Sequence, residues 1–168
     1  MQNEYKALAD SYKNALFSFT DYKVGGIGGS KLPISEYIIE VTYKNMTIKM
    51  RNELGNYNLG TVDLILSNCN FHSFEITSRN HFMSLFSRKK EMLKISCNNL
   101  SFRNTLQETV INCGLEKIAK QNAFEPHIVS SYKDGKWKVA SKYHLEFEDK
   151  IGAANALIDF YKLLIDFV

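Results

Sequence analysis

This sequence of 168 residues has only two prolines, three cysteines and one tryptophan. So few prolines in a chain that is 45% hydrophobic exclude an extended disordered protein. The cysteines, Cys69, Cys97 and Cys113, lie far apart and include no Cys-x-x-Cys pair, which excludes the usual zinc and dithiol motifs. We therefore expect reduced, buried thiols and no cofactor.

Long apolar runs and a strong net charge are missing as well. No stretch approaches the 18 or more apolar residues of a membrane-spanning helix, and the first residues lack the basic and apolar segments of a secretory leader. These absences predict a cytoplasmic protein without a membrane span. The net charge of +3 is too small to indicate a polyanionic partner, so nucleic-acid binding is disfavoured.

Regular alternation of apolar and polar residues predicts a first hairpin. Residues 34–43 and 46–51 alternate in this way around a two-residue turn at 44–45. The turn places Tyr43 opposite Met46 and brings the apolar residues of both strands to one face. Turn length and hydrophobic pattern therefore agree on the register.

Asp134-Gly135, between two alternating stretches, is a strong signal for a second hairpin. In its register Tyr132 faces Trp137. Four lysines lie along this hairpin: Lys133, Lys136, Lys138 and Lys142. With Trp137 and Tyr143 they could contact phosphates and stack on bases. The predicted register points the two aromatics away from most of the lysines, and lysines on an open ribbon are also explained by the need to discourage edge pairing.

A histidine cluster is expected on the outer face of the same hairpin. Its members are Glu125, His127, His144 and Glu146, with His127 diagonal to His144. Two imidazoles flanked by carboxylates can bind a divalent metal or act as an acid and base pair near neutral pH. The alternative is a solvated strand face, which the neighbouring lysines favour because cations oppose metal binding.

Shorter patterns complete the expected element order. Strands are predicted near 62–66, 74–76 and 93–97, a short helix after Ser78, and a helix opened by Asn104. A final helix begins at Asp149, a good N-cap residue. Because tight turns join most strands, we predict an α+β fold: a mainly antiparallel twisted sheet built from hairpins, with helices packed on one face.

The N-terminal region is predicted to be a separate element. Residues 1–24 carry apolar side chains three or four positions apart, which indicates an amphipathic helix. Residues 25–31 contain four glycines and form the predicted hinge, and 32–168 form a single α+β domain. A phosphate-binding loop is the alternative for the glycines, but such a loop follows a strand and opens a helix.

These features favour a non-catalytic interaction or binding module that acts through homo- or hetero-association. The partner is expected to be a protein or a second copy, contacted through the helical face of Leu8, Tyr12, Leu16 and Phe19. No Gly-x-Ser-x-Gly elbow is present, and His72 and His81 match no ligand spacing. The alternative is a small-ligand or metal-binding domain, possibly catalytic, that uses the His127 and His144 face or a pocket between sheet and helices.

Overall fold

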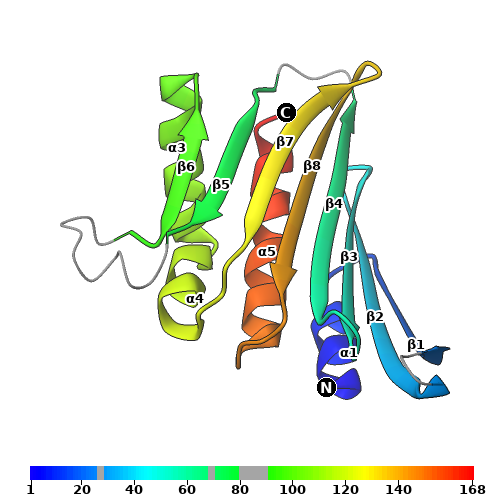
Figure 1. Ribbon diagram of the computed structural model, residues 1–168. Coiled ribbons are helices and arrows are strands. Elements are labelled where there is room, and N and C mark those ends of the chain that lie inside the picture. Colours follow the sequence, from blue (N-terminus) through cyan, green and yellow to red (C-terminus); the bar gives the residue numbers. More distant parts are fainter. Residues whose placement is uncertain (26–28, 68–70, 80–90) are drawn as a thin grey trace.

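The computed structural model describes residues 1–25, 29–67, 71–79 and 91–168. These residues form one eight-stranded antiparallel sheet, and the helices lie on one side of it (Figure 1). The strand order is β1-β2-β3-β4-β8-β7-β5-β6. The predicted α+β class is confirmed.

The elements of the described chain have the following bounds. The strands are β1 (Ala15–Gly25), β2 (Lys31–Tyr43), β3 (Met46–Leu54), β4 (Leu59–Ser67), β5 (Phe74–Ser78), β6 (Leu93–Cys97), β7 (His127–Lys133) and β8 (Lys136–His144). The helices are α1 (Gln2–Asp10), α3 (Leu100–Asn112), α4 (Leu115–Asn122) and α5 (Lys150–Asp166). None of the helices within these ranges is long and apolar enough to cross a membrane.

Both strong hairpins have the predicted registers. Tyr43 pairs with Met46 across the β2–β3 turn, and Tyr132 pairs with Trp137 in the β7–β8 ribbon. The turn residues have the positive φ angles that a two-residue hairpin requires, 51° for Asp134 and 76° for Gly135. Local turn chemistry therefore sets these two pairings.

The core lies between the sheet and its helices. Helix α5 carries the largest share of it, and its N-cap residue Asp149 accepts a hydrogen bond from the Gly152 amide at 2.7 Å. Inside the core, the Tyr161 hydroxyl donates to the Val62 carbonyl at 3.1 Å and shares a 2.7 Å hydrogen bond with Ser141. These bonds join α5 to β4 and β8.

The prediction of one helix through the N-terminal region is wrong. Helix α1 ends at Asp10, and Asn14, with φ of 61°, redirects the chain into strand β1. The helical spacing combined side chains from the two faces of this strand, since Phe19 lies on the helix-covered face and Leu16 and Tyr22 lie on the other. The alternation of residues 15–20 was the correct signal.

The prediction for the third helix is wrong in its limits. Asn99, and not Asn104, is the N-cap, and it accepts a hydrogen bond from the Phe102 amide at 2.9 Å. The helix is also interrupted at Gly114, whose φ of 85° starts a separate helix α4. The predicted short helix after Ser78 and the turn at 68–70 lie outside the described residues, as do residues 26–28 of the predicted hinge and His81.

Candidate interaction edge

Strand β1 is one of the two edges of the sheet and the more open one. None of its eleven residues is buried, and only β2 pairs with it within the described ranges. The other edge, β6, has five residues and packs against α3. An edge strand presents a row of free N–H and C=O groups that can pair with another chain.

The direction of the β1 backbone groups follows from one hydrogen bond. The Thr42 amide donates to the Asn14 carbonyl at 3.1 Å, just before the paired strand begins. Antiparallel pairs alternate, so the even-numbered residues of β1 bond to β2 and the odd-numbered residues direct their N–H and C=O groups outward. Pro33 agrees with this pattern, because its partner Lys23 is odd-numbered and no β1–β2 bond is lost.

The side chains of β1 do little to discourage pairing. Leu16 is 71% exposed, and Ser18 and Thr20 are exposed on the same face. The half of the strand from position 15 to position 20 has no charged residue, and the charges Asp21 and Lys23 come only in the other half. Short length, charged residues and proline are the usual protections of an edge, so this half of β1 is unprotected.

The four predicted interaction residues do not share one surface. Leu8 is buried in the core, and Tyr12 donates a 2.8 Å hydrogen bond to the Asn155 side chain of α5. Phe19 is half-buried against the ring of Tyr37, with 5.1 Å between centroids. Leu16 alone of the four is exposed, and it lies on β1. The part of this prediction that reaches the surface therefore belongs to the edge strand.

Helix α1 docks on its own sheet. Tyr5 is 1% exposed and stacks on Tyr37 with 4.8 Å between ring centroids. The Asn52 amide donates to the Tyr5 hydroxyl at 2.8 Å, and the Tyr143 hydroxyl donates to the Asn52 carbonyl oxygen at 2.7 Å. Burial raises the pKa of Tyr5 to about 12. This network links α1, which packs against β1 and β2, to β3 and β8.

All four residues of the predicted histidine cluster are exposed, with His127 and His144 at the ends of β7 and β8 and Glu125 and Glu146 just outside these strands. His127 Nε2 lies 2.8 Å from a carboxylate oxygen of Glu75 on the neighbouring strand β5. The sequence did not predict that Glu75 lies beside His127, because the β5–β7 pairing that brings them together joins segments far apart in the chain. The described residues contain no group of three or more His, Cys, Asp or Glu able to hold a metal, so the metal-binding alternative stays a prediction.

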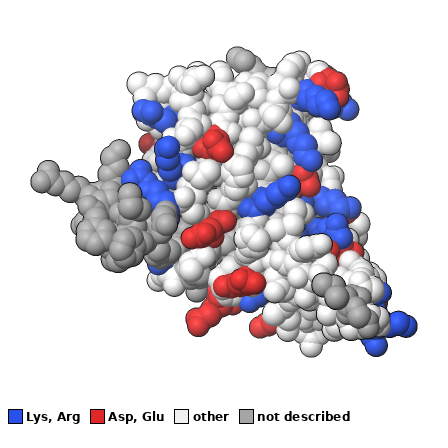
Figure 2. Space-filling view, in the orientation of Figure 1, with Lys and Arg blue, Asp and Glu red and all other residues white. Residues whose placement is uncertain are grey.

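Charges of both signs are mixed over the open face (Figure 2). Lys49 pairs with Glu40 and Lys138 with Asp63, each at 2.7 Å. Such exposed pairs contribute about 0–1 kcal/mol to stability. The predicted lysine ridge therefore has an acidic neighbour, and its aromatic member Tyr143 is buried and cannot stack on a base.

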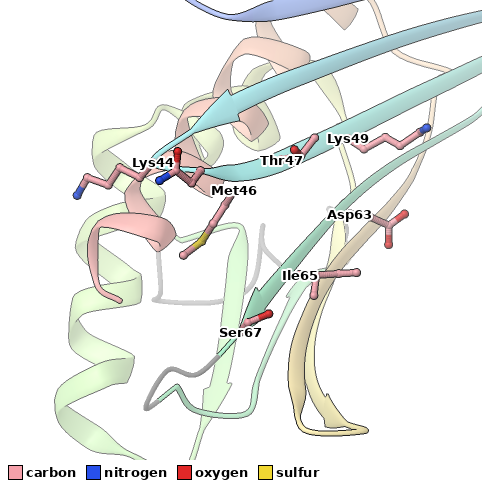
Figure 3. A pocket seen from close by; sticks show the side chains of 8 residues that line it. Lys44, Met46, Thr47, Lys49, Asp63, Ile65 and Ser67 are labelled. Atoms are coloured by element: carbon pink, nitrogen blue, oxygen red, sulfur yellow. The ribbon is translucent and has the colours of Figure 1, made fainter.

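A hollow of about 500 Å³ opens where β3 and β4 separate (Figure 3). Pairing between the two strands stops at Lys49 and Asp63, and the hollow continues toward Met46 and Ile65. It lies on the open face and not between sheet and helices. The charged groups among its described lining are held in ion pairs, with Lys44 bound to Asp166 at 2.8 Å, so no acid and base set is available there.

The thiol of Cys113 is also unsuited to nucleophilic chemistry. Burial raises its pKa to about 12, so the thiolate is scarce at neutral pH. Its Sγ lies 3.5 Å from the Val110 carbonyl in α3, and Cys97 and Cys113 are both half-buried, not fully buried as predicted.

The chain was compared with known protein families, sequences and structures. No family model, no curated protein sequence and no solved structure matches this chain.

Proposed function

We propose that this chain is a non-catalytic protein-interaction module that associates by adding a strand to the free edge of β1. The observation that supports this proposal is an eleven-residue edge strand with no buried residue and an uncharged half. In strand addition, main-chain hydrogen bonds supply affinity and the alternating side chains supply specificity. Leu16 is the exposed large apolar side chain of this edge.

The orientation of the backbone favours the same function. Because the odd-numbered residues of β1 direct their N–H and C=O groups away from β2, an incoming strand finds donors and acceptors already in line. Helix α1 and the ring of Tyr37 support the strand from below, so the edge is ordered before a partner arrives. A preorganised edge lowers the entropy cost of association.

A proline at an outward-facing position tests this function. Asp21→Pro removes an outward N–H and adds a ring at the edge, but it spares the hydrogen bonds between β1 and β2. Asp21→Ala is the matched control, because it removes the same carboxylate and keeps the N–H. Both variants should retain the native circular dichroism spectrum.

Association is then compared among the wild type, Asp21→Pro and Asp21→Ala. Sedimentation measures self-association, and quantitative mass spectrometry measures proteins retained from an extract of the source cells. Association that persists with Asp21→Ala and is lost with Asp21→Pro supports the proposal. Equal association of the two variants, or none with any form, refutes it.

A further inference from the structure

We infer that the strand which adds to β1 is the β1 strand of a second copy, antiparallel to the first and related to it by a two-fold axis at Tyr22. This inference rests on the proposed function and specifies its partner. It joins two eight-stranded sheets into one continuous sheet across a self-complementary interface. The pairing joins residues 19–25 of the two copies, the stretch that contains both charged residues of β1, and it leaves Leu16 outside.

Asp21 and Lys23 supply the charge complementarity. They lie two positions apart and therefore on the same face of the strand. Asp21 accepts a 2.7 Å hydrogen bond from the Ser35 hydroxyl, and within the described part of the chain neither Asp21 nor Lys23 has an ion-pair partner. With the axis at Tyr22, each Asp21 faces Lys23 of the other copy, so two opposite-charge pairs form at once.

Neighbouring registers lack this match. An axis at Asp21 or at Lys23 sets like charges directly opposite each other, which is unfavourable. An axis at Thr20 sets Asp21 opposite Phe19. All of these registers satisfy the rule that odd-numbered residues face odd-numbered residues, so charge decides among them.

The hydrogen-bond pattern also supplies a cross-linking test. Tyr22 is even-numbered and bonds to its own β2, so Tyr22 and its counterpart form a non-hydrogen-bonded pair with Cα atoms about 4.5 Å apart. This separation permits a disulfide. Tyr22→Cys should therefore link to itself under mild oxidation.

Leu16→Cys is the matched control for the cross-link. Position 16 is exposed on the same face, but it lies six residues from the axis, so the two Cα atoms would be about 40 Å apart. The wild type, oxidised in parallel, reports any linkage through its native cysteines. Covalent dimer from Tyr22→Cys, with little from Leu16→Cys or the wild type, is the expected result.

Charge reversal tests the register without a disulfide. Asp21→Lys or Lys23→Asp alone sets like charges opposite each other and should weaken the dimer about ten-fold in sedimentation equilibrium. The double variant Asp21→Lys/Lys23→Asp restores opposite charges and should return the dissociation constant to within about three-fold of the wild type. The inference is overturned if the double variant loses as much free energy of association as the two single variants together.

The outcomes separate this inference from the proposed function. A wild type that stays monomeric, or a dimer that Tyr22→Cys does not trap, overturns the second copy in this register. If Asp21→Pro still abolishes association in either case, strand addition at β1 stands with another register or partner. If Asp21→Pro leaves a dimer intact, that dimer uses another surface and both proposals fail.

Discussion

The buried hydrogen bonds of Asn52 offer a quantitative test of how α1 is held. Asn52 is 1% exposed on β3, and its side chain bonds to the hydroxyls of Tyr5 from α1 and Tyr143 from β8. Asn52→Ala removes the partner of both hydroxyls. The substitution leaves both hydroxyls without contact to solvent in the folded state, because both tyrosines are buried as well.

The expected loss of stability follows from the two tyrosine hydroxyls that Asn52→Ala leaves without a partner. A buried polar group left without a partner costs about 1–3 kcal/mol, so Asn52→Ala should lower the free energy of unfolding by about 2–6 kcal/mol. The stability of a whole domain is about 5–15 kcal/mol. The substitution should therefore remove a large share of it, although the surrounding apolar core is unchanged.

Urea unfolding, followed by circular dichroism, measures this loss. Asn56→Ala is the control, because Asn56 is exposed in the β3–β4 loop and its loss should cost no more than about 0.5 kcal/mol. A double-mutant cycle with Tyr5→Phe should give a coupling energy of about 0.5–3 kcal/mol. A loss below about 1 kcal/mol for Asn52→Ala would refute the reasoning, since the hydroxyls would then reach water and α1 would not be docked as described.

Three further predictions concern the hydrogen bonds between β1 and β2, the loss of stability at alkaline pH, and the packing of Gly60 against Tyr143. Thr20→Pro removes an inward hydrogen bond to β2 and should lower the free energy of unfolding in urea by about 1–3 kcal/mol, whereas Asp21→Pro should lower it by less than half as much. Equal losses would contradict the assigned alternation of inward and outward backbone groups in β1. The pKa of Tyr5 is raised to about 12 in the folded state, so the stability that its protonated form supplies is complete below pH 10 and is lost as the pH rises toward 12. Tyr5→Phe should flatten this loss of unfolding free energy by up to about 1.4 kcal/mol per pH unit, and an unchanged slope would argue against burial of the hydroxyl. A Cβ at Gly60 would overlap the buried ring of Tyr143, so Gly60→Ala should lower the free energy of unfolding by about 1–3 kcal/mol and with it the thermal midpoint. An unchanged midpoint would show that the ring can move aside.

The pairings that were predicted correctly are those of residues close in sequence. The turns at 44–45 and 134–135 set the registers of their hairpins, because a two-residue loop and the apolar alternation of both strands have to agree. Asp149 likewise marks the start of α5 through a local hydrogen bond. Such signals need no knowledge of the rest of the chain.

Strand β1 shows where sequence reasoning failed. Its apolar residues lie on both faces of the sheet edge, and taking them together produces a helical spacing that the structure does not have. Of the four predicted contact residues, only Leu16 is exposed on β1, and its role in association stays a prediction.

Sequence by itself therefore determined the α+β class, two hairpin registers and the final helix, because turn chemistry, capping and hydrophobic period act over a few residues. Only the tertiary structure decided that β1 is an edge, that α1 docks through Tyr5, and that Glu75 reaches His127. Each of these depends on which distant strands become neighbours. That choice is made by the burial of a shared core, and no local pattern in the chain records it.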